Sequence, residues 1–303
     1  QQRRAGERER AELRERLGWG SLSDDMKAAL WPIAVGRDNI DERGILQVSL
    51  AWSYTPTYRG ADNRGLDMDI NVDGDAVIVG QNQGTDSADP EFSEILMIEI
   101  DGAANASDGW TENWERSFKF GGSGVERFVG ARRGAVDLSG NSYACGRRNN
   151  DQYAVTKRDG ADGTSMWLKS FDAPNGGTNA IAEDIVVDAE GLVYVAGYYD
   201  DAVTKLDRWF VARHRPNNGN RDWIVDLGDG RPVGGIEIDR RGDLLLAGER
   251  EQDHVCMKIS PYDGTPYWVS TVPTVEEEFL GEFTDSLALD PDGNPVFAGA
   301  VDT

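Results

Sequence analysis

The 303-residue sequence predicts an all-β protein, a β-propeller of four-stranded blades with a short helical N-terminal extension. Three observations support this prediction. A short phrase recurs five times along the chain, the copies follow one another at a nearly constant period, and each complete copy ends in a strand that carries a tryptophan. Repeats of about 50 residues that each contain four strands are typical of propeller blades.

The recurring phrase is clearest at Asp188–Gly197. Apolar residues lead into an Asp-x-x-Gly turn, and a second β-prone run ends in glycine. Asp accepts hydrogen bonds within a turn and glycine adopts positive φ, so the phrase predicts a β-hairpin. The closing glycines are Gly80, Gly146, Gly197, Gly248 and Gly299, spaced 66, 51, 51 and 51 residues apart.

Each unit continues with a third β-prone run that ends in a charged residue and, after a turn, with a fourth run that contains a tryptophan. The charged residue and the tryptophan are Glu99 and Trp114, Lys157 and Trp167, Arg213 and Trp223, and Lys258 and Trp268. Four antiparallel strands per unit follow from this order. A helical repeat would need a periodicity of about 3.6 residues, which these segments lack.

The combined pattern is Asp-x-x-Gly-Asn-x-Tyr-x-x-Gly, then Val-x-Lys, then Gly-x-x-x-Trp, most clearly over residues 137–167. It resembles the bacterial β-propeller repeat family found in secreted and cell-surface proteins, and the resemblance covers residues 62–303. It implies blades and an extracellular or cell-surface location, and it implies no particular activity.

We predict complete blades at residues 62–120, 126–174, 181–228 and 234–273, and the first two strands of a fifth blade at 282–303. Residues 45–55 resemble a fourth strand, so we expect this segment to complete the fifth blade, whose third strand has no evident source. The predicted propeller therefore covers residues 45–303. Residues 1–44 are expected to be a helical, partly flexible extension, with a helix over residues 23–31.

The charge balance excludes two classes of partner. Asp and Glu number 54 against 31 Lys and Arg, which gives a formal net charge of -23. Nucleic acid and anionic membrane surfaces would repel such a protein, and no apolar run is long enough to insert into a membrane. Residues 1–44 are neutral in sum, so the propeller carries the whole charge. An acidic, Lys-poor surface favours a saline extracellular setting.

Residues near the start of each innermost strand form the first candidate site. Four residues before the turn, the strands carry Asp67, Arg133 and Asp184 in three of the five units. We expect them to form a ring of mixed charge at the mouth of the central channel. Such a ring would bind a ligand or a cation, or it would only order water.

The loops between the second and third strands vary most in length, and variable loops on a rigid scaffold commonly carry binding residues. The alternative is that these loops vary without a function. The candidates are Arg147, Arg148, Tyr198, Tyr199, Asp200, Glu249 and Arg250.

A third candidate is a metal site at the first hairpin. Asp69, Asn71 and Asp73 match the first half of an EF-hand loop, whose oxygen ligands suit calcium. The match then fails, because the twelfth position is Gly80 where that loop requires Glu. The alternative is that these are ordinary turn residues, as in the other blades.

These observations favour a non-catalytic propeller that binds other protein subunits as a scaffold module, possessing no obligatory cofactor, within an extracellular assembly. The alternative is a propeller enzyme that binds a cofactor or a glycan, similar to the quinoproteins. Both histidines lie outside catalytic motifs, and the vicinal cysteines of that class are missing, since Cys145 and Cys256 are far apart in the sequence and are expected to be free thiols. The scaffold hypothesis predicts apolar patches on the rim, whereas the enzyme hypothesis predicts convergent carboxylates with shifted pKa values.

Overall fold

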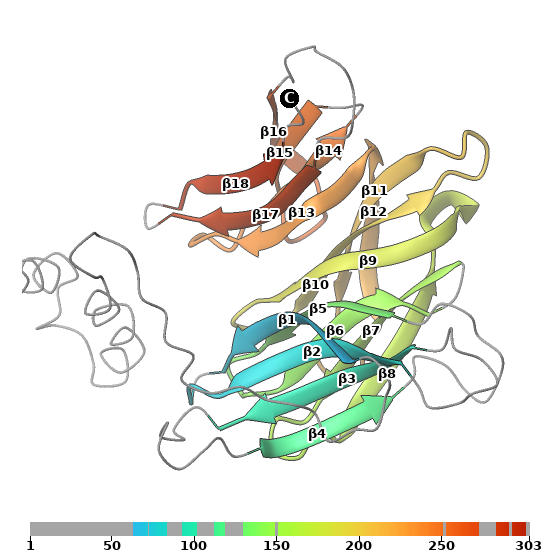
Figure 1. Cartoon of the computed structure of the whole chain (residues 1–303). Helices are drawn as coiled ribbons and strands as arrows, with labels where there is room; N and C mark the ends of the chain where they lie inside the picture. The colour runs from blue at the N-terminus through green and yellow to red at the C-terminus, as the bar shows by residue number, and fades with distance from the viewer. Residues whose placement is uncertain are drawn as a thin grey trace, which may run out of the picture. The chain divides into compact units, whose positions relative to one another are not determined.

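The computed structural model describes residues 63–71, 73–83, 93–101, 112–118, 130–148, 151–250, 253–272, 283–290 and 293–300. These residues form antiparallel sheets and one short 3-10 turn (Pro174–Gly176), with no α-helix among them (Figure 1). No helix within these ranges is long and apolar enough to cross a membrane.

Four sheets contain four strands each, in sequence order from the innermost to the outermost. The first sheet is β1 (Asn63–Ile70), β2 (Ala76–Gln83), β3 (Ser93–Ile100) and β4 (Glu112–Phe118). The second is β5 (Gly130–Val136), β6 (Ser142–Arg147), β7 (Gln152–Arg158) and β8 (Ser165–Asp172). The third is β9 (Thr178–Val187), β10 (Val193–Asp200), β11 (Asp207–His214) and β12 (Arg221–Asp229). The fourth is β13 (Arg231–Ile238), β14 (Leu244–Arg250), β15 (Asp253–Ile259) and β16 (Pro266–Val272). A fifth, two-stranded sheet pairs β17 (Phe283–Leu289) with β18 (Pro295–Ala300).

The all-β propeller fold predicted from the repeats is confirmed by these sheets. We number these five sheets as blades one to five in chain order. The predicted extension over 1–44, its helix and the closing strand at 45–55 lie outside the described residues.

The hairpin between the first and second strand of each blade is held by its first residue. In the second blade, one carboxylate oxygen of Asp137 accepts the backbone N–H groups of Ser139 and Asn141, both at 2.9 Å. The glycine at the fourth turn position, Gly140 in this blade, has a φ of +80°. A side chain at such a φ is strained, which explains why the glycine recurs in every copy of the phrase.

Each innermost strand contains an irregularity in its pairing at an equivalent position, a β-bulge. The register shifts between Gly65 and Asp67 in β1, and between Ala131 and Arg133 in β5. Strands β9, β13 and β17 are irregular at the corresponding place. A bulge places one extra residue on one strand and redirects side chains, so consecutive residues there no longer alternate between the two faces.

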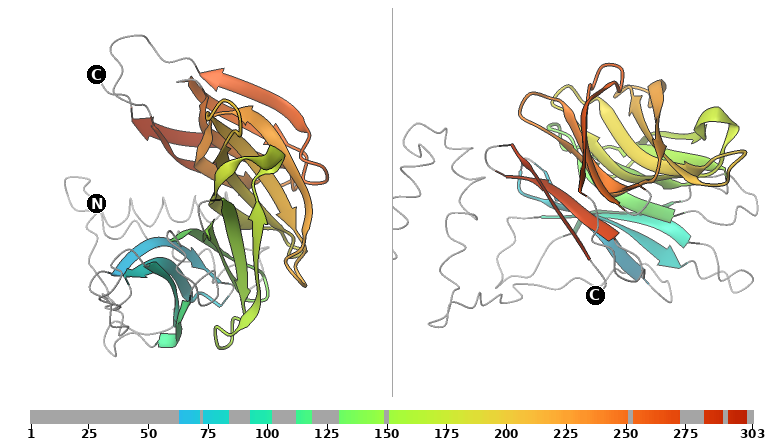
Figure 2. Two further views of the ribbon diagram at one scale, coloured as in Figure 1. Left: turned by 90° about the vertical axis from the view of Figure 1, so that its right-hand side faces the viewer. Right: turned by 90° about the horizontal axis from the view of Figure 1, so that it is seen from above.

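Neighbouring blades are joined by shared apolar packing. Val79 and Met97 of the first blade form one buried cluster with Ala144 and Ala154 of the second. The innermost strands β1, β5, β9, β13 and β17 contact one another in that order, as the views in Figures 1 and 2 allow the reader to follow. The core therefore lies between the blades.

A tryptophan on the fourth strand closes the joint after the first blade and the joint after the second. The indole N–H of Trp114 donates to the carbonyl of Gly160 at 2.9 Å, in the turn between the third and fourth strands of the next blade. Trp167 makes the same bond to Pro216 at 3.0 Å. The ring lies so close to the turn that a Cβ added to Gly163 would be 2.5 Å from Trp114. The tryptophans are therefore packing residues between blades.

Candidate functional site

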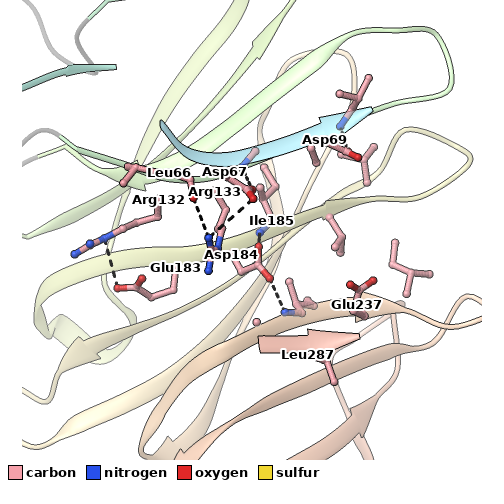
Figure 3. A pocket seen from close by; sticks show the side chains of 18 of the residues that line it. Leu66, Asp67, Asp69, Arg132, Arg133, Glu183, Asp184, Ile185, Glu237 and Leu287 are labelled. Carbon is pink, nitrogen blue, oxygen red and sulfur yellow. Dashed lines mark hydrogen bonds and ion pairs between the residues drawn. The ribbon is translucent and has the colours of Figure 1, made fainter. Parts of the chain in front are cut away.

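The innermost strands line a cavity of about 680 Å³ (Figure 3). Its wall comes from β1, β5, β9 and β13, with Leu287 of β17. Five carboxylates and two guanidinium groups line it, so its described charge is negative. They are Asp67, Asp69, Glu183, Asp184, Glu237, Arg132 and Arg133.

Three of these carboxylates bind backbone amides of the next blade. Asp67 accepts the N–H of Gly134 at 2.8 Å, and Asp69 accepts the N–H of Val136 at 2.9 Å. The innermost strand is an edge of its sheet, so its outward N–H groups need partners. These acids supply them, and they join one blade to the next.

The predicted ring residues Asp67, Arg133 and Asp184 do converge in this cavity. Arg133 donates from Nη1 to the carbonyl oxygen of Leu66 at 3.1 Å, and the same nitrogen is 3.9 Å from Asp67. Asp184 accepts the N–H of Ile236 at 2.8 Å and that of its neighbour Ile185 at 2.8 Å. Burial among the strands raises the pKa of Asp184 to about 7, although these two amides and Arg133 oppose the shift.

The charged residues beside this ring were missed by sequence reasoning. The extra residues of two bulges, Arg132 and Glu183, face each other with Nε 3.6 Å from Oε1. Glu237 lines the wall as well, and its pKa is raised by burial and by the charge of Asp69. In a regular strand, Arg132 and Glu183 would lie on the opposite face from the residues next to them. The bulges instead place them on the same cavity wall as Arg133 and Asp184.

We use the name mouth cluster for Arg132, Glu183, Tyr198, Asp207 and Arg231. The guanidinium carbon of Arg231 lies 4.8 Å from the centre of the Tyr198 ring, and Arg231 forms an ion pair with Asp207. Burial and the neighbouring carboxylates of Glu183 and Asp207 raise the pKa of Tyr198, although Arg231 and Arg132 oppose the shift. The cluster joins β5, β9, β10, β11 and β13, so it spans three blades.

Two further predicted loop residues lie beside the mouth cluster. Arg147 donates to the amide oxygen of Asn179 at 2.9 Å, and Asn179 donates in turn to Asp200. Asn179 adopts a φ of 55°, in the left-handed region where Asn is better tolerated than most side chains. Asn179, on a constrained stretch of backbone, therefore connects Arg147 to Asp200.

The remaining predicted loop residues have structural contacts. Arg148 donates to Ser170 at 2.7 Å. Tyr199 is fully buried, because successive side chains on β10 point to opposite faces, and its hydroxyl accepts from Asn175 at 3.2 Å. Arg250 binds the carbonyl of Leu227 at 2.8 Å. The backbone carbonyl of Glu249 accepts the indole N–H of Trp209 at 3.0 Å.

The metal site at Asp69, Asn71 and Asp73 stays a prediction, and two of these side chains, Asp69 and Asn71, have contacts within the fold. Asp69 turns to the neighbouring blade, as described above. The side-chain oxygen of Asn71 caps its own turn by accepting the N–H groups of Asp73 and Asp75 at 3.0 and 2.9 Å. Within the described ranges, no group of three or more His, Cys, Asp or Glu side chains is arranged to hold a metal ion.

The classical nucleophiles of the described chain lie away from the cavity. Cys145 and Cys256 are free and buried, as expected for thiols without a partner. His214 is fully buried between Tyr153 and Phe171, and burial lowers its pKa to about 4. None of the three lines the cavity.

Comparison with known proteins supports the fold and gives no evidence about function. No protein-family model and no curated protein sequence matches the chain. A solved structure of a protein from Lactobacillus plantarum has 11% identity and a TM-score of 0.50, over 78% of this chain and 64% of that one. Hydrazine synthase from Kuenenia stuttgartiensis has 14% identity and a TM-score of 0.46, over 80% and 57%. Polysaccharide lyase Uly1 has 12% identity and a TM-score of 0.45, over 76% and 53%. The chain thus spans little more than half to just under two thirds of these structures.

Proposed function

We propose that the chain is a non-catalytic β-propeller module that binds another protein subunit at the mouth cluster, within an extracellular assembly. The observation that carries this proposal is the contact between Arg231 and the half-buried ring of Tyr198, with Arg132 close by. Tyr and Arg are the residue types, with Trp, that contribute most of the energy of protein interfaces.

The electrostatics of the cavity support binding more than catalysis. Asp67, Asp69 and Asp184 each bind a backbone N–H of the next blade, so all three already serve the fold. The pKa of Tyr198 is raised from an already high value, so its hydroxyl is neutral near pH 7 and is a donor rather than a base.

The extracellular setting is part of the same proposal. The net charge of -23 supports it, because a highly acidic surface keeps a protein hydrated and monomeric in salt. The likeness of residues 137–167 to the secreted propeller repeats supports it as well. We therefore expect the partner to be a secreted or cell-surface protein.

Affinity capture tests the proposal. The tagged full chain and its Tyr198→Ala and Arg231→Ala variants are incubated with the secreted fraction of the source organism, and captured proteins are quantified. We expect a defined partner that both variants lose by about tenfold or more, as each removes a central contact. Arg215→Ala is the matched control, because Arg215 is also exposed and paired with an Asp, in the turn after β11. Equal capture by wild type and both variants would contradict the proposal.

One observation favours the enzyme alternative. A carboxyl group whose pKa is about 7 is suited to general acid–base catalysis, and Asp184 lies in the cavity beside Arg133. A cofactor- or glycan-binding enzyme would use it in that way. Turnover of a polysaccharide or of a quinone-linked substrate, abolished in Asp184→Asn while the melting temperature is kept, would replace the scaffold proposal.

A further inference from the structure

In each complete blade, the first residue of the second strand lies directly opposite the last residue of the third strand. The pairs are Ala76 and Ile100, Ser142 and Arg158, Val193 and His214, and Leu244 and Ile259. The pKa of His214 is about 4, so this residue is neutral at pH 7. Of these four described pairs, the one in the second blade alone carries a charge.

The guanidinium group of Arg158 is buried without a counter-charge. Arg158 is 7% exposed, and its Nε atom is enclosed without a hydrogen-bond partner. Within the part of the chain that the structure describes, no carboxylate forms an ion pair with this side chain. Its N–H groups can only donate, and burying a charge without a partner is costly. A group that accepts from Arg158 is therefore expected.

The hydroxyl group of Ser142 lacks a partner as well. Ser142 is fully buried, and its Oγ atom has no hydrogen-bond partner among the described residues. Residues directly opposite each other in paired strands lie on the same face of the sheet. Ser142 and Arg158 thus share the face on which Ala144 and Ala154 pack against the first blade. Two unsatisfied polar groups lie together on a face that is otherwise apolar.

The first blade covers this guanidinium group with an aromatic ring and adds a second positive charge. The guanidinium carbon of Arg158 lies 3.6 Å from the centre of the Phe118 ring. A ring stacked on the flat face of a guanidinium group leaves the N–H groups in its plane free to donate. Burial and the charge of Arg116 lower the pKa of Arg158 to about 10, so Arg158 is still charged at pH 7.

One carboxylate interacts with Arg116, and it does not neutralise Arg158. Asp162, in the turn between β7 and β8, is fully exposed and accepts the backbone N–H of Thr164 at 2.8 Å. Its pKa is lowered chiefly by Thr164 and to a smaller extent by Arg116. Asp162 does not contribute to the pKa of Arg158. The buried cation therefore stays unpaired in a chain that has 54 acidic residues.

We propose that a chloride ion binds to the guanidinium group of Arg158, beside Ser142, at the joint between the first and second blades. The N–H groups of Arg158 and the hydroxyl group of Ser142 donate to the ion, and Arg116 adds a second positive charge. A water molecule would accept the same hydrogen bonds but would leave the buried charge uncompensated.

The enclosure of the site favours a single small ion. Arg158 is 7% exposed and Ser142 is fully buried, so a phosphate group or an acidic side chain of a partner is too large to enter. Neither residue belongs to the mouth cluster. The chloride site therefore does not depend on the proposed binding of a protein subunit.

Thermal unfolding of the full chain in sodium chloride and in sodium gluconate, at equal ionic strength, is the first test. Gluconate is too large for an enclosed site, so we expect the Tm of the wild type to be about 3 °C higher in chloride. Arg158→Ile installs the residue of the first and fourth blades and should abolish this difference. Arg241→Ile makes the same change at an exposed turn arginine and should keep it.

Bromide gives a second readout that does not depend on stability. Crystals of the wild-type full chain soaked in sodium bromide should show an anomalous scattering peak beside the guanidinium group of Arg158. These crystals test the site even if Arg158→Ile fails to fold. Arg158→Lys keeps the charge without the planar fork, so it should bind chloride about tenfold more weakly in a titration followed by Tm.

Three results would overturn the proposal. The first is the absence of a bromide peak at Arg158. The second is an equal difference in Tm between chloride and gluconate for the wild type and Arg158→Ile. The third is a bromide peak without any effect of chloride on the Tm of the wild type, which would mean binding at crystal concentration only.

Discussion

The carboxylate of Asp184 in the third blade accepts the backbone N–H of Ile236 in the fourth, at 2.8 Å. Asp67 makes the same bond from the first blade to Gly134 of the second. An acidic side chain in the cavity is thus a connection between neighbouring sheets, placed where an edge strand would otherwise present an unpaired donor.

Replacing Asp184 by Ala should lower the free energy of unfolding by about 1–3 kcal/mol, because the N–H of Ile236 loses its acceptor. Asp184→Asn keeps a side-chain oxygen and should lose less. Urea unfolding monitored by circular dichroism measures both. An Asp184→Ala variant as stable as the wild type would show that water replaces the bond at no cost.

Protonation of Asp184 should make the fold respond to pH. Its pKa is about 7 in the folded chain and about 3.8 as the ordinary value, so the folded state holds the proton more tightly. This contribution to stability is complete below about pH 4 and is lost as pH rises through 7. Relative to Asp184→Asn, the wild type should lose stability from pH 4 to 7, measured by urea unfolding at each pH.

His214 should act in the opposite direction. Its folded pKa of about 4 lies below the ordinary 6.5, so acidification favours the unfolded chain, which binds the proton first. Stability should fall by about 3 kcal/mol between pH 6.5 and 4 from this residue alone. His214→Phe, which retains an aromatic ring against Tyr153 and Phe171, should remove this dependence. An unchanged pH profile in that variant would assign the dependence to other groups.

The tryptophan joints predict a difference between two glycines of similar backbone conformation. Gly163 and Gly140 have φ of +70° and +80°. A Cβ at Gly163 would be 2.5 Å from Trp114, whereas nothing lies within 4 Å of one at Gly140. Gly140→Ala should cost about 1 kcal/mol of backbone strain. Gly163→Ala should cost about 1–3 kcal/mol more, because the indole must move. If urea unfolding shows that both variants lose the same free energy of unfolding, the Trp114 side chain moves away from Gly163 at no cost.

Both thiols should be unreactive in the native chain. Cys145 is completely buried and Cys256 is 4% exposed, and burial raises the pKa of each. The thiolate is the reactive form, so Ellman's reagent should label neither at pH 8 until guanidinium unfolds the protein. Rapid labelling of one thiol without denaturant would reveal local opening of its blade.

Local patterns in the sequence were sufficient for the blades and only partly sufficient for the site. Asp137 and Gly140 define a hairpin by their own chemistry, so its repetition predicts the sheets. Arg132 and Glu183 were missed because bulges break the alternation of side chains along a strand. The residue types at these positions do not indicate a bulge. Glu99 was visible as a charged strand end, but the hydrogen bond that it accepts from Asn113 depends on the pairing of two strands and could not be read from the sequence.

The tryptophan bonds of the first two blades and the acid–amide bonds of the first and third blades point the same way, from one blade to the one that follows it. Trp114 reaches forward to Gly160, and Asp184 reaches forward to Ile236. The second blade therefore carries both halves of such a joint, because Gly160 receives Trp114 and Trp167 reaches forward to Pro216. A gene duplication that copies such a period would produce a unit already compatible with both neighbours, so the number of blades could change while these contacts are kept.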